Sequence, residues 1–316
     1  MNLIPEDDLQ VLLEDGERVL CRTRRVKGFG DKHSALALCL ATQQLSSVKL
    51  DRLAHELSLK GDLDSAWSAR PLEIVREDRG VMLLLEDPGG EPLERLLVKQ
   101  MDIGTFLRVS VGAAAAVARM HERRLVHKDI KPANILVGCD DGMTRLTGFG
   151  FASSLVRERQ TPDPPEVIAG TLAYMAPEQT GRMNRSTDSR SDLYSLGVTF
   201  YRMLTGSLPF SAADPMEWVH CHIARKPTPP AQAQPTVPTP VSEIVMKLLA
   251  KTADERYQTA SGLLHDLSLC LLEWERDGRI DAFPLAQRDL PGRLPIPEKL
   301  YGREREVEAL LAAFAR

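Results

Sequence analysis

The chain lacks most of the features that mark secreted, membrane-spanning or nucleic-acid-binding proteins. Its five cysteines are odd in number and scattered over 316 residues, which favours free thiols in a reducing cytosol over a disulfide framework. The formal net charge of −4 provides no basic field for nucleic acid. The first residues lack the basic and apolar regions of a signal peptide, and no run approaches the ~18 apolar residues of a membrane span. We therefore expect a cytoplasmic globular chain.

One short cluster of metal-binding residue types is present, His220-Cys221-His222. On a helix, neighbours at i+1 and i+2 point to different faces, so a single ion could not readily collect all three side chains. We interpret the cluster as part of an ordinary helix.

The first ninety residues have the pattern of a small β-rich unit. Alternating apolar residues, separated by turn residues such as Asp15-Gly16, predict strands. Ser46 and Ser47 are candidate caps for a helix that carries Leu50, Leu53 and Glu56. The expected strands are 9–13, 18–24, 35–41, 72–75 and 81–85, and the turn 87–90 ends the last of them.

After Gly90 the pattern becomes helical. The expected helices are 103–124, 190–204, 241–251 and 260–274. The proline-rich stretch 226–240 predicts an extended connector; binding to an SH3-like groove is the less favoured alternative. From about Arg276 the composition is typical of a linker.

The most informative stretch is 127–137, which reads His-Lys-Asp-Ile-Lys-Pro-Ala-Asn-Ile-Leu-Val and is followed by Thr147-Gly148-Phe149-Gly150. The first segment resembles the catalytic loop H-R-D-x-x-x-x-N of protein kinases, and the second lies where that family carries D-F-G. The resemblance implies three roles. Asp129 would accept the proton of the substrate hydroxyl, Lys131 would lie near the γ-phosphate, and Asn134 would bind Mg²⁺.

Other motifs extend the resemblance along the chain. Residues 170–178 resemble the end of a kinase activation segment, in which Thr171 would bridge the catalytic Asp and Lys and Glu178 ends the A-P-E motif. By the same resemblance, Asp192 would hold the catalytic loop and Arg256 would pair with Glu178. His127, Phe149 and Gly150 would have structural roles.

This resemblance to the Ser/Thr protein-kinase superfamily implies an α+β fold with two lobes. The small lobe would have five strands and one helix, and the large lobe would be mainly helical. We expect a kinase-like domain over 1–275, divided near residue 88, a linker over 276–295, and the start of a truncated AAA-type ATPase domain over 296–316. The motif near Gly302 and the wider pattern resemble the N-terminal module of bacterial signalling proteins that continue with ATPase, GAF and sensor histidine kinase domains.

The nucleotide-binding half of the motif set is incomplete. Gly16 is the one glycine of the first hairpin, where the family carries G-x-G-x-x-G, and strand 35–41 contains no lysine. Glu56 on the helix therefore lacks its usual partner, although Lys32 or Lys49 could reach in from elsewhere. Gly148 replaces the metal-binding Asp. Leu85, Glu86 and Asp87 remain as candidate hinge residues for adenine.

These observations support two hypotheses. By resemblance, the chain is a Ser/Thr protein kinase that uses ATP and Mg²⁺ on a protein substrate, with weak or lost activity because of the three missing parts. Alternatively, it is a pseudokinase scaffold or nucleotide sensor that regulates a downstream ATPase or histidine-kinase module. We expect no nucleic-acid partner and no membrane span in this chain.

Overall fold

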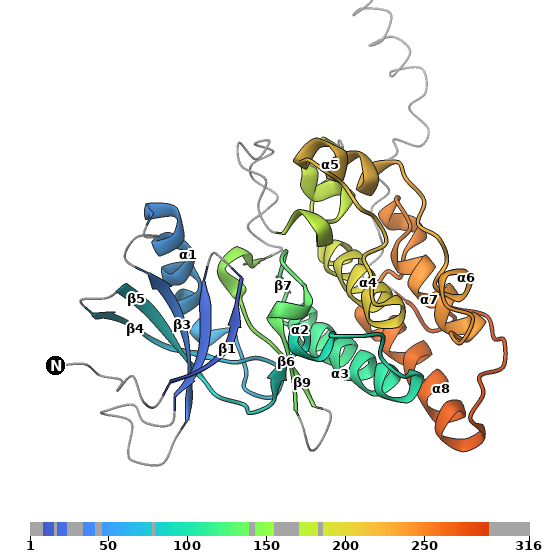
Figure 1. The fold of residues 1–316 in the computed structure, drawn as a ribbon, viewed down its shortest axis with the longest axis horizontal. Coiled ribbons are helices and arrows are strands. Elements are labelled where there is room, and N and C mark those ends of the chain that lie inside the picture. The colour runs from blue at the N-terminus through green and yellow to red at the C-terminus, as the bar shows by residue number, and fades with distance from the viewer. Residues whose placement is uncertain are drawn as a thin grey trace, which may run out of the picture.

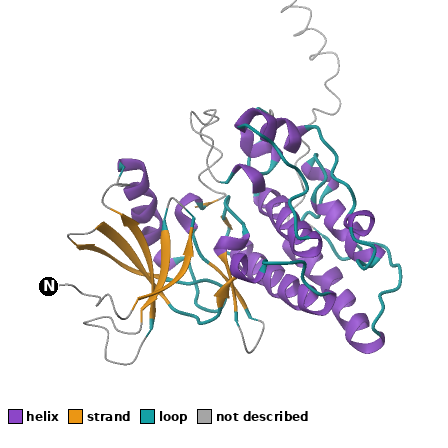
Figure 2. Cartoon of the chain, viewed as in Figure 1, coloured by secondary structure: helices purple, strands orange, loops and turns teal. Residues whose placement is uncertain are grey.

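The computed structural model divides the chain into a β-rich lobe and a helical lobe, joined near residue 88 (Figure 1). It describes residues 9–15, 18–23, 34–41, 46–77, 80–138, 143–154, 171–182 and 186–290. Gly16, Lys32 and the expected ATPase segment 296–316 lie outside these ranges. The described elements confirm the predicted bilobal α+β fold (Figure 2).

The small lobe is one antiparallel sheet with strand order β1-β2-β3-β5-β4. Leucines alternate with smaller residues along β3, so one face of the sheet carries Leu36, Leu38 and Leu40, all buried. The apolar cluster on this face also includes Leu136 of the large lobe. The strands are β1 (Leu9–Glu14), β2 (Val19–Thr23), β3 (Ala35–Ala41), β4 (Pro71–Glu77) and β5 (Gly80–Glu86).

Helix α1 (Ser47–Ser58) covers the leucine face of this sheet. Ser46 caps its first turn, because the Ser46 side chain accepts a hydrogen bond from the Lys49 backbone N–H at 3.3 Å. Leu53 packs into the sheet cluster, and Glu56, one turn later, is buried as well. The predicted cap and the predicted position of Glu56 are both confirmed.

The large lobe is built around α3, which packs along α8. Short strands at the lobe boundary carry the catalytic loop. They are β6 (Glu91–Pro92), β7 (Leu125–Val126), β8 (Ile135–Val137), β9 (Thr144–Leu146) and β10 (Ser153–Ser154). The helices are α2 (Leu93–Leu96), α3 (Ile103–Glu122), α4 (Ser189–Thr205), α5 (Pro215–Ile223), α6 (Pro230–Ala233), α7 (Thr239–Leu248) and α8 (Ala260–Asp277).

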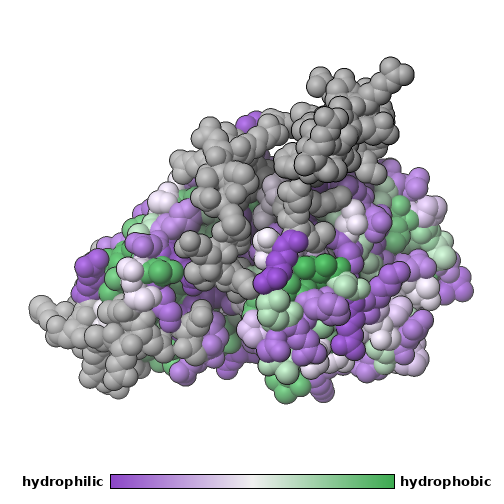
Figure 3. Space-filling view, turned by 90° about the horizontal axis from the view of Figure 1, so that it is seen from above, coloured by the Kyte–Doolittle hydropathy of each residue, from purple (hydrophilic) through white to green (hydrophobic). Residues whose placement is uncertain are grey.

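Helix α3 is the one described helix that is long and apolar enough to cross a bilayer. Two thirds of its apolar window (67%) is buried inside the large lobe, which is the environment of a core helix. Figure 3 shows that, on one face of the molecule, hydrophobic residues in the coloured part form separate patches among hydrophilic ones.

Two segments differ from the sequence prediction. The proline-rich stretch is only partly extended, because it contains α6 and the start of α7. Proline at the first positions of a helix removes a donor that has no intrahelical partner, so such a stretch can initiate helices.

The segment 278–290 was expected to be a linker, yet it packs on the large lobe. Its Phe283 and Leu285 contact the core, and the Asp289 carboxylate accepts hydrogen bonds from the backbone N–H and the hydroxyl of Thr259 at 2.8 and 2.7 Å. The composition does not predict this contact, because one aspartate and a few apolar residues do not distinguish a docked segment from a linker.

Candidate active site

The catalytic loop follows β7, and a single carboxylate fixes its start. Asp192 of α4 is fully buried and accepts hydrogen bonds from the backbone N–H groups of His127 and Lys128 at 2.9 and 2.8 Å. The backbone of Lys128 has a left-handed φ of 67°, a strained conformation that these two bonds hold in place. The structure thus places Asp192 where the resemblance requires it.

His127 connects the catalytic loop to the segment before Gly148. Its Nε2 donates to the Thr147 carbonyl at 3.0 Å, so its Nδ1 is left to accept the Asp129 backbone N–H at 3.3 Å. Burial lowers the pKa of His127, which keeps the ring neutral and compatible with this pattern. The ring also packs against Phe149, with 4.8 Å between centroids.

The four residues assigned to phosphoryl transfer are brought together. Lys131 Nζ donates to Thr171 Oγ1 at 2.6 Å and lies 3.4 Å from Asp129 Oδ2. The Thr171 backbone N–H donates to Asp129 Oδ1 at 3.0 Å, and Asn134 Nδ2 donates to Asp129 Oδ2, also at 3.0 Å. Asp129 therefore has both oxygens oriented, which is the preorganisation that a catalytic carboxylate needs.

Glu56 turns towards the segment that replaces D-F-G. The backbone N–H groups of Gly148 and Phe149 favour the charged form of its carboxylate and so act to lower its pKa, while its Oε1 has no hydrogen-bond partner. Burial raises the pKa of Glu56, and the positive charge of Arg18 opposes this rise. Helix α1 is thus docked in the site although β3 contains no lysine to pair with Glu56.

Arg18, the residue before β2, extends from the small lobe to the catalytic loop and donates to Asn134 Oδ1. Val19 pairs with Cys39 in the sheet, so Arg18 lies opposite Leu40, on the same face as Leu38. Sequence reasoning missed Arg18, because strand residues and catalytic-loop residues 116 positions apart give no local signal of contact.

Arg18 lines a cavity of about 70 Å³ between the lobes. Lys49, one of the two lysines considered as substitutes, also lines it. The remaining lining residues are Leu38, Leu40, Arg52, Leu53, Glu56, Asp129, Lys131, Gly148, Gly150 and Phe151.

The predicted hinge residues do not line this cavity. Leu85 is fully buried in the small-lobe core, and Glu86 accepts from Ser65 Oγ. Asp87 forms an ion pair with Arg22 at 2.8 Å. Pro88 adds no backbone N–H to this segment. The structure therefore keeps both hinge carboxylates occupied with protein partners, and the hinge role stays a prediction.

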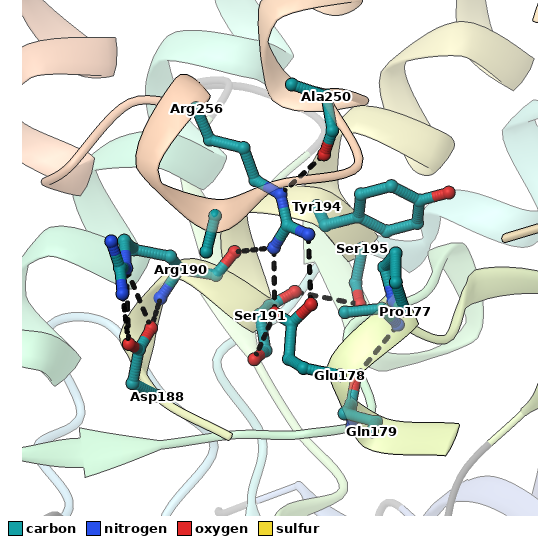
Figure 4. A network of polar contacts seen from close by, with 12 residues as sticks. Pro177, Glu178, Gln179, Asp188, Arg190, Ser191, Tyr194, Ser195, Ala250 and Arg256 are labelled. Carbon is teal, nitrogen blue, oxygen red and sulfur yellow. Dashed lines mark hydrogen bonds and ion pairs between the residues drawn. The ribbon is translucent and has the colours of Figure 1, made fainter. Parts of the chain in front are cut away.

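The predicted support of the activation segment forms a buried network (Figure 4). Arg256 donates to both oxygens of Glu178 at 2.7 and 2.9 Å, and Ser191 Oγ donates to the same carboxylate at 2.7 Å. Burial is the largest single effect and opposes ionisation of Glu178, but the bonds and charge of Arg256 together with the bond from Ser191 outweigh it, so the pKa of Glu178 is lowered. The guanidinium also stacks over Tyr194, at 4.9 Å from the ring centroid.

The described residues fit Mg²⁺ poorly. Asp129 is the one carboxylate beside Asn134, because Gly148 supplies no ligand, and Asn134 Oδ1 accepts from Arg18. Within the described ranges, no group of three His, Cys, Asp or Glu side chains is arranged to hold a metal ion. A magnesium ion at Asn134, as predicted, would therefore compete with Arg18 for the Oδ1 oxygen of Asn134.

Comparison with known proteins agrees with this geometry. Residues 31–268 match the family described as protein kinase domain, which is more than half of the chain. The chain belongs to the protein kinase family. Members of this family generally use ATP and Mg²⁺ and act on protein substrates. Arg18 lies outside the matched residues.

Several relatives are serine/threonine-protein kinases. A probable serine/threonine-protein kinase of Clostridium perfringens is 30% identical over 218 residues, covering 68% of this chain and 31% of that protein. PknB of Mycolicibacterium smegmatis is 33% identical over 161 residues, covering 51% and 25%. A hybrid signal transduction histidine kinase of Dictyostelium discoideum is 27% identical over 303 residues, covering 68% and 9%. The chain thus spans a third or less of the length of these relatives.

Proposed function

We propose that the chain is the protein-kinase-like module of a larger signalling protein and transfers phosphate slowly from ATP to protein Ser or Thr side chains. The observation that carries this proposal is the assembled group of Asp129, Lys131, Thr171 and Asn134. These residues constitute the part of a kinase site that receives the substrate hydroxyl.

The geometry supports a role for each residue. Asp129, with both oxygens oriented, accepts the proton of a Ser or Thr hydroxyl placed beside it. Lys131 lies 3.4 Å from Asp129 and presents its charge to the transferred phosphoryl group. Thr171 holds Lys131 through its hydroxyl and Asp129 through its backbone, so one residue fixes the distance between the other two.

The proposed rate is low because the phosphate-binding half has lost three parts. Removing one preorganised charge contact costs on the order of 3 kcal/mol, or ~10²-fold in rate. Three independent losses would remove ~10⁶-fold, although groups within one site are rarely additive. A kinase rate of about 1–100 s⁻¹ would then fall to about 10⁻⁶–10⁻⁴ s⁻¹, roughly one turnover in three hours at most.

A second function, a pseudokinase scaffold, is favoured by the apolar filling between the lobes. Leu20 of β2, Leu38 of β3 and Leu136 of β8 belong to one buried cluster and are each at most 4% exposed. An aromatic base that enters here must displace these side chains. The Dictyostelium relative, named as a hybrid histidine kinase, supports a place beside other signalling domains, such as the expected ATPase and histidine-kinase modules.

A phosphotransfer assay tests the main proposal. The purified chain is incubated with γ-labelled ATP and a panel of Ser/Thr-containing proteins, alongside Asp129→Asn and the matched exposed control Asp281→Asn. We expect slow labelling that Asp129→Asn reduces at least tenfold and that the control leaves unchanged. Labelling equal in all three chains would exclude Asp129 as the base. No labelling by a folded chain would favour the scaffold function.

A further inference from the structure

The disagreement between this site and Mg²⁺ has a specific cause in Arg18. The side chain of Arg18 is 18% exposed, and its Nε pairs with Asp15 at 3.3 Å. Its inner end donates to Asn134 Oδ1, the oxygen that a second metal ion would use. The guanidinium of Arg18 therefore uses the oxygen that the family resemblance assigns to a metal ion.

Neither partner removes the charge of Arg18 from the cavity. Asn134 is a neutral amide, so its hydrogen bond orients the guanidinium without neutralising it. Asp15 pairs with the Arg18 Nε at 3.3 Å, while the Arg18 side chain lines the cavity. Arg18 therefore still offers N–H donors to an anion between the lobes.

The other charged side chains around the cavity add to this field. Its lining contains four cationic side chains and two carboxylates. The cations are Arg18, Lys49, Arg52 and Lys131; the carboxylates are Glu56 and Asp129. The excess of two positive charges (four minus two) suits the phosphates of a nucleotide, which protein cations bind by charge-assisted hydrogen bonds.

Gly148 permits the contact between Arg18 and Asn134. A Cβ at position 148 would lie 2.7 Å from Asn134 Oδ1, too close for any side chain while the amide keeps its present place. A residue with a side chain at 148 would displace the acceptor of Arg18. The missing Asp and the inserted Arg are therefore structurally compatible features of one site.

We propose that Arg18 binds the phosphates of the nucleotide directly, in place of both the strand lysine and Mg²⁺, so that this chain binds nucleoside triphosphate without a metal ion. The proposal rests on the nucleotide-binding part of the proposed function. Because Mg²⁺ and Arg18 compete for Asn134 Oδ1, Mg²⁺ gives no gain in affinity.

Calorimetric titration with ATP tests this, once in excess EDTA and once in excess MgCl₂. The chains are the wild type, Arg18→Ala, Arg18→Lys and the exposed control Arg76→Ala from the same sheet. In EDTA we expect Arg18→Ala to weaken ATP binding by about 10- to 100-fold, the range for a lost charge-assisted hydrogen bond. Arg18→Lys should recover part of the affinity, because it keeps the charge and loses the planar fork. Arg76→Ala should bind as the wild type does.

Inorganic tripolyphosphate is titrated in parallel to identify the source of the phosphates. Weaker binding of tripolyphosphate than of ATP, with both sensitive to Arg18, supports a nucleotide ligand. Equal binding that depends on Arg18 supports the metal-free site but shows that the base contributes nothing. ATP binding that requires Mg²⁺ and is unchanged in Arg18→Ala overturns the proposal, as does the absence of binding by a chain shown to be folded by thermal melting.

The two proposals fail in different assays. Labelling that depends on Asp129 but not on Arg18 overturns the role of Arg18 and leaves the kinase function standing. Binding in EDTA that depends on Arg18, without any labelling, overturns the transferase activity and leaves the metal-free site standing.

Discussion

Replacing Arg256 by Ala tests how much of the large lobe's stability depends on its buried ion pair. The Arg256 side chain is 0% exposed and Glu178 is 4% exposed. Its guanidinium also donates to the carbonyls of Ala250, Arg190 and Lys251. Removing it leaves a buried carboxylate and three carbonyls without these donors, for which a loss of about 3–5 kcal/mol is expected. The melting temperature should then fall by about 10 °C.

The design includes a rescue and a matched control. Arg256→Met combined with Glu178→Leu removes both charges and should recover much of the lost stability, because well-packed apolar residues often replace a buried pair at little cost. Arg276→Ala removes an exposed arginine that pairs with its neighbour Asp277, and it should leave the melting temperature unchanged. Differential scanning calorimetry measures all of these variants. A loss in Arg256→Ala no larger than in Arg276→Ala would refute the reasoning.

The pH dependence of the same pair gives an independent check. Burial raises the pKa of Glu178, but the bonds and charge of Arg256 and the bond from Ser191 together outweigh it, so the pKa is lowered in the folded chain. A lowered carboxyl pKa contributes stability that is present above the unfolded value of about 4.5 and is lost as the pH falls through the folded value. Glu178→Gln should therefore lose more stability at pH 7 than at pH 3, and denaturant melts at the two values measure the difference.

Three further predictions follow from single contacts. Asp289→Ala should release the segment 278–290 from Thr259 and cost about 1–2 kcal/mol in urea melts, with faster hydrogen exchange confined to that segment and the start of α8; uniform exchange would contradict it. Burial lowers the pKa of His222 to about 4, so the stability contributed by its neutral ring is complete above pH 6.5 and is lost as the pH falls towards 4. His222→Gln should therefore reduce the loss of stability between these two pH values. A pH profile of stability that the substitution leaves unchanged would contradict this. Gly148→Asp alone should weaken ATP binding in EDTA, because the new Cβ displaces the acceptor of Arg18. Gly148→Asp combined with Arg18→Ala should make ATP binding depend on Mg²⁺. Metal-independent ATP binding by the double variant would contradict the competition between Arg18 and the metal.

The sequence predicts the catalytic loop well, because its residues follow one another closely and match a family motif. The spacing from Asp129 to Asn134 fixes a short turn that brings the two side chains within hydrogen-bond distance of each other. The pairing of Glu178 with Arg256 was expected from the family resemblance, although these residues are 78 positions apart. The order of the helices and strands could also be predicted, because hydrophobic periodicity and caps such as Ser46 depend on only a few neighbouring residues.

Long-range contacts without a motif could not be predicted in this way. Arg18 meets Asn134 only because the two lobes close on each other, and the docked segment 278–290 depends on the side chain of Asp289. The surroundings of Glu56 could not be predicted for the same reason. Without a strand lysine, its carboxylate is influenced by the backbone N–H groups of Gly148 and Phe149, and a sequence pattern does not reveal backbone donors.

The degraded half of the site is therefore better understood as a rearranged set of charges than as a set of unrelated losses. The leucines of β3 line the cavity with apolar side chains, so β3 brings no cation to it. The cation comes instead from the residue before β2, where Arg18 also pairs with Asp15. Gly148, at a left-handed φ of 81°, leaves room for the Asn134 amide that orients this arginine. Loss of activity alone would not require a positive charge between the lobes, whereas binding of phosphate does. The retained excess of positive charge around the cavity therefore favours a ligand-binding module over an inert remnant of a kinase.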